Sequence, residues 1–210
     1  WDSPWGRGRP GWHIECSAMS LKYLGAGFDI HGGGRDLIFP HHENEIAQAE
    51  GALDEPFVRF WMHNGMLNLT EVKMSKSLGN TLSLRDILDQ HRPEALIAAF
   101  LGSHYRSPLE FSAELLAETE HQVDRLRNVF RGLGDAAAGA EDAPSEPGAG
   151  GGAALVERSE VRRQAFDEAL ADDLNTAAAL AEVFSLAREA NAALAADGLP
   201  AGVAAKVREA

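Results

Sequence analysis

The spacing of apolar residues changes near Ser83, and this change constrains the fold more than any other feature of the sequence. Before it, short apolar runs such as 28–30 are interrupted by glycines such as 32–34, which is typical of strands and loops with short helices between them. After it, apolar residues recur every three or four positions over 84–130 and again over 155–186, as in amphipathic helices. The sequence therefore predicts an α/β layer followed by an all-α region.

Within the α/β part, the same patterns predict individual elements. A short helix is expected over 17–24, with Cys16 just before it at the end of a strand, and a second helix over 43–50 after Pro40. Residues 57–62 form a short apolar run bounded by turn residues. Such a run predicts a buried strand in a parallel sheet that is covered on both faces.

Composition limits the class of protein. A chain of 210 residues with 45% hydrophobic residues can bury a core. It contains no apolar run of about 18 residues, the length that a membrane span needs. The single cysteine, Cys16, cannot form an internal disulfide, which favours a reducing compartment, and we expect a cytoplasmic protein.

The net charge of −13 is unevenly distributed. Residues 1–85 contain 8 Lys and Arg against 10 Asp and Glu, whereas residues 86–210 contain 11 against 22. An acidic chain argues mildly against a nucleic-acid surface. Charge summed over a chain does not map a local groove, however, so this argument excludes nothing.

Residues 73–80, Lys-Met-Ser-Lys-Ser-Leu-Gly-Asn, place two lysines three positions apart among serines and a glycine. Such a loop can direct both ammonium groups and several backbone N–H groups toward a polyphosphate and neutralise its charge. A solvated surface turn is the alternative for any pair of lysines at this spacing. Eight residues in this order are more specific than such a pair.

A second constellation suits a metal ion. His41 and Glu45 are four positions apart at the start of a helix, so their side chains lie on one face, and Cys16 comes from a separate segment. His42 and Glu43 are also capable of binding metal. A thiolate, an imidazole and a carboxylate suit zinc, which catalytic sites bind with three protein ligands and an open position. The alternatives are a buried cysteine that only packs, and histidines that cap a helix.

The five residues Lys73 to Ser77 are identical to the KMSKS signature of the class I aminoacyl-tRNA synthetases. The stretches 4–19 and 28–45 resemble one family of that class in particular, the cysteinyl-tRNA synthetases. This resemblance implies that Cys16, His41 and Glu45 bind a catalytic zinc ion. It also implies that Lys76, assisted by Lys73, stabilises the phosphates of ATP.

Three further roles are implied by the resemblance. Glycines 32–34 allow close approach of the backbone to a ligand, and Asp36 is expected to contact the ribose of ATP. His63, in a strand that borders the adenine in this family, is a candidate ATP contact or an ordinary core histidine. Trp12 is a candidate wall of a cysteine pocket or an ordinary core tryptophan.

The resemblance implies a cysteine-tRNA ligase that activates cysteine with ATP, with Mg²⁺, to cysteinyl adenylate and transfers it to tRNA(Cys). One zinc ion per chain selects the substrate thiol, because a thiolate is a softer ligand than the hydroxyl of serine, whereas apolar contacts distinguish near-isosteric amino acids by only about 1–3 kcal/mol. The expected partners are tRNA(Cys), cysteine and ATP, with no membrane, and the expected oligomeric state is a monomer. Two alternatives remain: the related cysteine ligase of mycothiol synthesis, and a non-catalytic zinc-stabilised RNA-binding module.

The expected organisation has four parts. Residues 1–85 form the C-terminal half of a Rossmann-like class I catalytic domain, and residues 86–133 form a helical region that contacts the tRNA stem. Residues 134–154 form a flexible linker, and residues 155–210 form the start of a helical tRNA-binding bundle. The linker follows from a stretch rich in Ala, Gly, Pro, Ser and Glu with almost no bulky apolar residue. Residues 172–176 are predicted as a turn or N-cap. The chain is expected to be an internal fragment that lacks the HIGH motif, another zinc-binding cysteine and the C-terminal end, and to be inactive in isolation.

Overall fold

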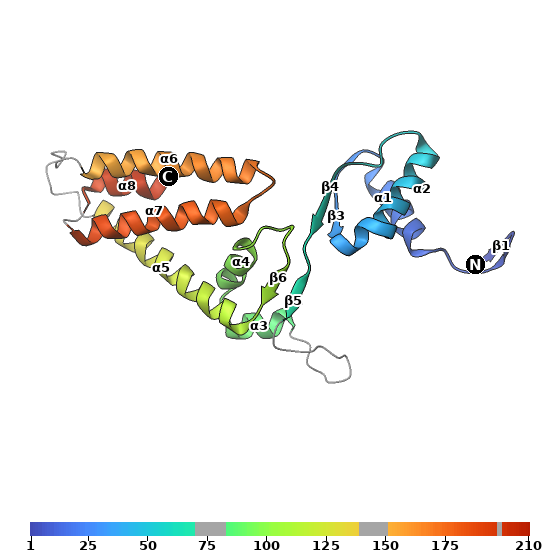
Figure 1. The fold of residues 1–210 in the computed structure, drawn as a ribbon, viewed down its shortest axis with the longest axis horizontal. Helices are drawn as coiled ribbons and strands as arrows, with labels where there is room; N and C mark the ends of the chain where they lie inside the picture. The colour runs from blue at the N-terminus through green and yellow to red at the C-terminus, as the bar shows by residue number, and fades with distance from the viewer. Residues whose placement is uncertain (70–82, 139–150, 197–198) are drawn as a thin grey trace. The chain divides into compact units, whose positions relative to one another are not determined.

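The structure is a computed structural model that describes residues 1–69, 83–138, 151–196 and 199–210. The lysine-containing loop at 73–80 therefore lies outside the described residues. The chain divides into two compact units: unit 1 comprises 1–67 with 106–108, and unit 2 comprises 68–105 with 109–210. Figure 1 shows the elements of both. Among the described helices, none combines the length and apolar character required to span a bilayer.

Unit 1 is an α/β layer. It contains β1 (Asp2–Ser3), β2 (Gly6–Arg7), α1 (Trp12–Leu24), β3 (Phe28–Gly34), the 3₁₀ turn η1 (Arg35–Leu37), the irregular helical turn η2 (Ile38–His42), α2 (Glu43–Leu53) and β4 (Val58–Asn64). β1 and β2 form a small antiparallel hairpin. β3 and β4 pair in parallel, with η1, η2 and α2 forming the connection between them. This is a βαβ unit, in which the crossover helix brings two strands into parallel alignment.

The helix that carries Cys16 begins earlier than the sequence pattern predicts. Gly11 is extended, helix α1 begins at Trp12, and Gly25, with a φ of 79°, ends it. A positive φ is accessible to glycine without steric cost, which explains why the helix stops there. The placement of Cys16 at the end of a strand was therefore wrong: no proline or glycine separates Trp12 from Cys16, so the helix continues through both. The predicted helix at 43–50 is confirmed by α2.

The strand pair is less buried than predicted. Phe57 and Val58 are 1% and 7% exposed, and they anchor the start of β4. Ile30 and Phe60, which are direct partners in the parallel register, are 58% and 61% exposed. The expectation of a sheet covered on both faces was therefore wrong for this chain, because the described residues cover only one face of the strand pair.

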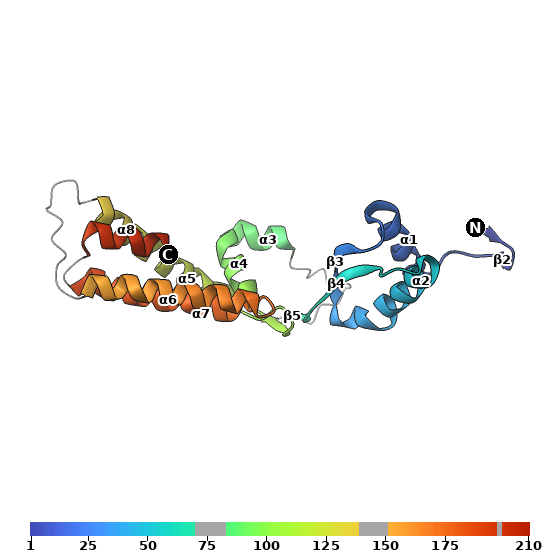
Figure 2. The ribbon, with the colours of Figure 1, turned by 90° about the horizontal axis from the view of Figure 1, so that it is seen from above.

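Unit 2 is mainly helical, as predicted. It contains α3 (Leu84–Gln90), α4 (Pro93–Leu101), α5 (Ala113–Ala138), α6 (Gly151–Ala171), α7 (Thr176–Ala196), α8 (Ala201–Glu209), and a short sheet formed by β5 (Leu67–Leu69), which begins in unit 1, and β6 (Leu109–Phe111). Helices α6 and α7 pack side by side, and α8 packs on α5 and α6 (Figures 1 and 2). Together with unit 1, this confirms the predicted order of an α/β part followed by helices.

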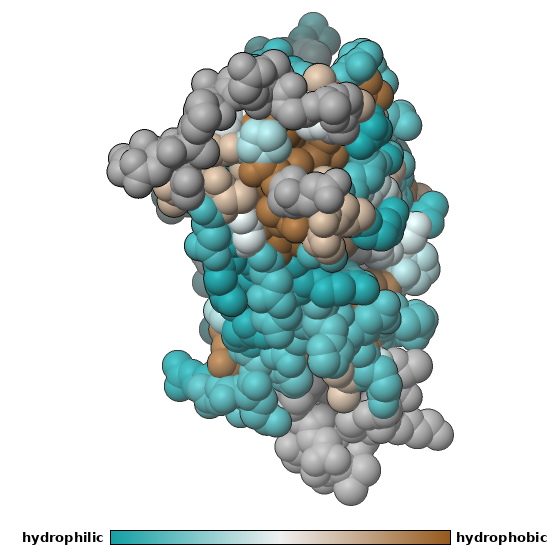
Figure 3. All heavy atoms as spheres, turned by 90° about the vertical axis from the view of Figure 1, so that its left-hand side faces the viewer, coloured by the Kyte–Doolittle hydropathy of each residue, from teal (hydrophilic) through white to brown (hydrophobic). Residues whose placement is uncertain are grey.

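Two apolar clusters hold the helices of unit 2 together. The larger joins α5, α6, α7 and α8 through the buried residues Val129, Leu133, Leu155, Ala190, Ala204 and Val207. The smaller joins α3, α4, β6 and α5 through Ile87, Leu96, Ala99, Phe111 and Leu116. In the face shown in Figure 3, hydrophilic residues cover most of the described surface and hydrophobic residues gather in one region. The three-to-four spacing of apolar residues thus corresponds to inward-facing helix stripes.

The connections between these helices differ in part from the sequence pattern. Helix α5 continues to Ala138 and α6 begins at Gly151, so helix occupies both ends of the stretch 134–154 for which a linker was predicted, and residues 139–150 lie outside the described residues. The predicted turn at 172–176 is confirmed. Asp173 and Leu174 have positive φ angles, and Asn175 Oδ1 accepts a hydrogen bond from the backbone N–H of Ala178 at 3.1 Å. The four-part domain division remains a prediction.

Candidate metal centre

The three side chains singled out as metal ligands lie together in unit 1. Cys16 comes from α1, His41 from η2 and Glu45 from α2, and one donor atom of each lies within 4.8 Å of the other two. His41 and Glu45 are buried, and Cys16 is half-buried. The arrangement brings a thiol, an imidazole and a carboxylate to one point. That these three residues bind a metal remains a prediction.

Packing of α1 on α2 creates this arrangement. Ser17, the residue next to Cys16, is 2% exposed, and its hydroxyl donates to Gln48 Oε1 of α2 at 2.8 Å. His41 is placed one helical turn before Glu45, so its ring lies beside that carboxylate. The small Ser17 side chain thus fixes the distance between the helix that carries the thiol and the helix that carries the carboxylate.

Glu45 is the most unusual residue of the site. Its side chain is 0% exposed, and its two oxygens lie 2.7 Å from Nε2 of His41 and 2.8 Å from Nε2 of His31. Neither imidazole contact counts as a hydrogen bond, and the Cys16 thiol is a weak donor to the same carboxyl group. Burial raises the pKa of this carboxyl group. A buried carboxylate with so little hydrogen bonding is costly unless a cation compensates its charge.

Burial also changes the pKa values of the neighbouring groups. Burial, and then the nearby Glu45 carboxylate, raise the pKa of the Cys16 thiol. The pKa values of His31 and His41 are lowered, mainly by burial and further by neighbouring imidazoles. For His42, burial together with His31 and other histidines lowers the pKa to about 4. These imidazoles are therefore neutral near pH 7, which is the form that binds metals.

His13 and Trp12 hold the ring of His41 in place. The Nδ1 atoms of His13 and His41 are 2.7 Å apart, so one of them donates a hydrogen bond to the other. The Trp12 ring stacks on His41 with centroids 4.2 Å apart. If Nδ1 of His41 is the donor, its Nε2 atom carries a lone pair on the side of Glu45. Such a partner on the far nitrogen is the usual way in which proteins orient a metal-binding imidazole.

The structure adds His31 and His13, which the sequence analysis did not assign to the site, and places there His42, which it named only as capable of binding metal. His31, His42 and Glu45 form a second group of donors within 4.8 Å, sharing the carboxylate with the first group. His42 Nδ1 lies 2.8 Å from His63 Nε2. His13 lies three positions before Cys16, on the same face of α1, which is the one sequence signal that could have pointed to it.

The glycines at 32–34 are strand residues, which end β3 and pair with Met62, His63 and Asn64 of β4. A Cβ atom at Gly33 would lie 2.9 Å from Cε1 of His42, and one at Gly34 would overlap Oδ1 of Asp36. The missing side chains of Gly33 and Gly34 thus make room for His42 and Asp36. The close approach by these two side chains is the physical reason for glycine at both positions.

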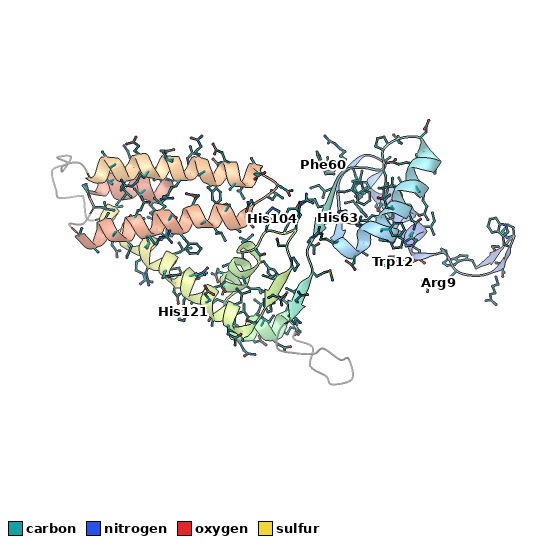
Figure 4. All side chains as sticks on the ribbon, in the orientation of Figure 1. Arg9, Trp12, Phe60, His63, His104 and His121 are labelled. Carbon is teal, nitrogen blue, oxygen red and sulfur yellow. The ribbon has the colours of Figure 1, made fainter. Side chains whose placement is uncertain are left out.

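The remaining candidate residues are placed as follows. Asp36 is exposed in η1, directly after the end of β3. His63 is half-buried in β4 and Trp12 is 56% exposed at the start of α1 (Figure 4). Neither of the last two is a fully buried core residue. Lys73 and Lys76 lie outside the described residues.

A βαβ unit with a buried donor cluster, followed by helices, is the order of elements that the sequence predicted. A family model described as the class I tRNA synthetase (C) catalytic domain matches residues 1–121, and a DALR domain model matches residues 165–210. The first match covers more than half of the chain, so the chain belongs to the class I tRNA synthetases.

Within this class, the curated relatives to which the chain is similar are cysteine-tRNA ligases, which confirms the resemblance seen in the sequence. The ligase of Pelotomaculum thermopropionicum is 54% identical over 196 residues, covering 92% of this chain and 39% of the relative. That of Geobacter sulfurreducens is 50% identical over 213 residues, covering 100% of this chain and 43% of the relative. The chain thus spans about two fifths of the length of these relatives.

Solved structures agree on the fold. A LeuRS–tRNA–LeuAMS ternary complex from Agrobacterium radiobacter K84 matches with a TM-score of 0.70 at 16% identity, covering 86% of this chain and 24% of that one. A putative arginyl-tRNA synthetase from Campylobacter jejuni matches with a TM-score of 0.63 at 14% identity, covering 96% and 48%. At such identities the similarity is one of fold alone, and it confirms the predicted class of architecture.

Proposed function

We propose that this chain is part of a cytoplasmic cysteine-tRNA ligase that activates cysteine with ATP and transfers the cysteinyl group to tRNA(Cys). The observation that carries the proposal is the meeting of Cys16, His41 and Glu45 at one point in a chain of this family. The proposed enzyme is an ATP-dependent ligase. Its chemistry relies on positioning and charge stabilisation, without a protein nucleophile.

The residues present fit a zinc ion. Cys16 offers a soft sulfur ligand, His41 a neutral imidazole, and Glu45 a buried carboxylate whose contacts with two imidazoles are not hydrogen bonds. This is a donor set that zinc prefers, and three protein ligands leave a position for a substrate. When bound, zinc supplies a position that accepts a thiolate in preference to an alcohol. Cys16 is accordingly a ligand and not an attacking thiol.

Residues around the cluster fix its geometry. His13 holds the far nitrogen of His41, and Trp12 covers the face of that ring. Trp12 is 56% exposed, so part of its surface remains accessible to a bound amino acid. We propose that Trp12 forms one wall of the cysteine pocket, with the metal ligands at its base. A partly open aromatic surface beside polar groups is a common design for small-ligand sites.

For ATP, we propose Lys76 and Lys73 as the groups that neutralise the phosphates while pyrophosphate leaves, with Mg²⁺ assisting. Asp36 is proposed to accept hydrogen bonds from the ribose hydroxyls, since it is exposed and follows directly on the end of β3. His63 is proposed as a further contact of the nucleotide. The contact between His63 Nε2 and His42 Nδ1 places His63 beside the histidines of the candidate metal centre.

The proposal is tested by the exchange of labelled pyrophosphate into ATP, measured with the protein at its full natural length. Exchange should depend on cysteine, and serine should not replace it. A Cys16→Ser variant should lose both zinc and the preference for cysteine over serine. A protein that shows no cysteine-dependent exchange while it still binds RNA would instead be the non-catalytic RNA-binding module.

The related ligase of mycothiol synthesis is separated by the acceptor. Aminoacylation of a tRNA(Cys) transcript with cysteine supports the tRNA ligase. Transfer of cysteine to an amino-sugar amine, without aminoacylation of tRNA, would contradict it. Because both enzymes activate cysteine, the acceptor assay is needed in addition to pyrophosphate exchange.

A further inference from the structure

The turn at Arg106–Pro108 belongs to unit 1, although the residues on both sides of it in the sequence belong to unit 2. It packs against Gly65, the residue that directly follows β4. A Cβ atom at Gly65 would overlap the backbone carbonyl group of Ser107 and would lie 2.7 Å from the nitrogen of Pro108. Only glycine permits so close an approach of two backbones. The main chain therefore holds this turn at the end of β4.

That end of β4 is the edge at which a parallel sheet binds its ligands. The last residues of β3 and β4, Gly34 and Asn64, are direct partners in the parallel register, so both strands end at the same edge. Asp36 follows the end of β3, and Gly65 follows the end of β4. In open α/β sheets, ligands bind outside the carboxyl ends of the strands. The turn at 106–108 thus borders the edge where Asp36 is proposed to contact ribose.

Arg106 gives this turn a positive charge, and the residue is exposed. Burial lowers the pKa of His63 in β4 (Figure 4), and the positive charge of Arg106 lowers it further. The guanidinium group therefore lies within electrostatic range of His63. Because His63 is mainly neutral near pH 7, Arg106 and not His63 supplies the positive charge at the end of β4.

A guanidinium group at this edge suits a phosphate ligand. Arginine stays charged at physiological pH, and its planar set of donors can bind two phosphate oxygens at once. The phosphates of a nucleotide are attached to its ribose, so a phosphate contact near Asp36 is consistent with a single bound ATP molecule. The sequence that leads to Lys73 and Lys76 continues from this same end of β4, through Gly65 and β5. Phosphate is therefore the anion that the neighbouring residues favour.

We propose that Arg106 is a further catalytic residue of cysteine activation and binds the phosphates of ATP together with Lys73 and Lys76. This inference rests on the proposed function. In the reaction, a carboxylate oxygen of cysteine forms a bond with the α-phosphorus, and the bond from that phosphorus to the oxygen bridging to the β-phosphate breaks. The bridging oxygen keeps the electron pair and leaves as part of pyrophosphate. Arg106 compensates the negative charge that grows on the leaving phosphates, and a fixed cation at that position lowers the barrier.

The test compares Arg106→Gln and Arg106→Lys with Arg59→Gln in the protein at its full natural length. Arg59 is the matched control, because it is an exposed arginine of unit 1 near the amino end of β4 and pairs with Asp29. Pyrophosphate exchange is measured over a series of ATP and cysteine concentrations. Binding of Mg·ATP is measured directly by isothermal titration calorimetry, and thermal melting confirms that the variants are folded.

Arg106→Gln should lower kcat/KM for ATP by roughly 10- to 100-fold, because hydrogen bonds to a charged group are lost. It should also weaken the binding of Mg·ATP and leave the KM for cysteine unchanged. Arg106→Lys keeps the charge but not the planar set of donors, so it should lose less than Arg106→Gln. Arg59→Gln should behave like the parent.

Unchanged ATP kinetics and ATP binding in Arg106→Gln would overturn the proposal, as would an equal loss in Arg59→Gln. A loss confined to the KM for cysteine would assign Arg106 to the carboxylate of the amino acid and contradict the ATP contact. A loss seen only in transfer to tRNA, with normal pyrophosphate exchange, would assign Arg106 to the RNA and contradict it equally.

The calorimetry separates the role of Arg106 from the proposed function. A parent that binds Mg·ATP more tightly than Arg106→Gln but shows no cysteine-dependent exchange would retain the ATP contact and refute the proposed enzyme. A parent that exchanges normally, with Arg106→Gln equal to it, would refute only the role of Arg106. A parent that binds no ATP would refute both.

Discussion

Replacing Glu45 by glutamine removes one charge at the centre of the candidate metal site while preserving the size of the side chain. Glu45 is 0% exposed, and its two oxygens lie 2.7 and 2.8 Å from imidazole nitrogens of His41 and His31. If the site binds zinc, the variant loses one of three protein ligands provided by this chain. An amide oxygen is neutral and binds zinc poorly compared with a carboxylate.

The size of the effect follows from linkage between binding and folding. Loss of a group that only supports a ligand costs 10–100-fold in metal affinity, so loss of a ligand should cost about 100-fold or more. At a free zinc concentration of about 100 times the parental Kd, binding stabilises the folded protein by about 2.7 kcal/mol. A Kd that is 100-fold weaker leaves about 0.4 kcal/mol at the same concentration. The difference, about 2.3 kcal/mol, corresponds to roughly 5–9 °C in the zinc-dependent shift of melting temperature for a domain of about 150–250 residues that unfolds cooperatively.

Zinc affinity is measured by competition with a chromophoric chelator, and thermal melting is followed with and without zinc, both on the protein at its full natural length. Glu43→Gln is the matched control, because Glu43 lies on the same helix, is exposed and undergoes the same chemical change. It should keep the parental affinity and the full melting shift. A Glu45→Gln variant that binds zinc like the parent, with an undiminished shift, would refute the assignment of Glu45 as a ligand.

Three further predictions concern unit 2. Leu155 is 0% exposed in the larger apolar cluster, so Leu155→Ala should lower the unfolding free energy by about 3–5 kcal/mol in urea denaturation, and a loss below about 1 kcal/mol would show that the site repacks. Ser83 and Asp86 cap the start of α3 reciprocally, each side chain accepting a hydrogen bond from the backbone N–H of the other. Ser83→Ala should therefore lower the unfolding free energy by about 1 kcal/mol and speed amide hydrogen exchange in the first turn of that helix. Unchanged exchange would contradict the cap. Burial raises the pKa of Glu189, but hydrogen bonds from Arg162 and Arg158 outweigh it and the net shift is downward from 4.5. The ion pair therefore contributes stability above about pH 4.5, and this stability is lost as the pH falls through the folded-state pKa of Glu189. Arg162→Met should weaken this dependence of the unfolding free energy on pH, measured by urea denaturation between pH 3 and 7. An unchanged pH dependence would contradict the role of the pair.

Local sequence patterns were sufficient for the elements whose boundaries depend on neighbouring residues. The largely polar sequence at 172–176 predicts the turn before α7, and Ser83, the N-cap residue, predicts the start of α3. The crossover helix α2 follows from the helical pattern after Pro40. In each case, the energy that fixes the element comes from capping, turn conformation or helix periodicity within a few residues.

Local patterns failed where burial depends on the rest of the fold. The run 57–62 is apolar enough for a strand covered on both faces, yet Phe60 is 61% exposed, because what covers a sheet face is set by distant segments. The start of α1 was also misjudged, because a chain rich in Trp, His and Cys has no strong helix propensity of its own. In the structure, packing of α1 on α2 accompanies the longer helix.

The sequence by itself determined the order of an α/β part and a helical part, the family to which the chain belongs, and the identity of Cys16, His41 and Glu45 as candidate ligands. It could do so because family motifs are written in contiguous residues, and because His41 and Glu45 are one helical turn apart. The tertiary structure alone decided that Cys16 meets them, that Glu45 is buried between two imidazoles, and that His13 supports His41. These contacts join residues up to 29 positions apart, and only the packing of α1 on α2 and the parallel pairing of β3 with β4 bring such residues together.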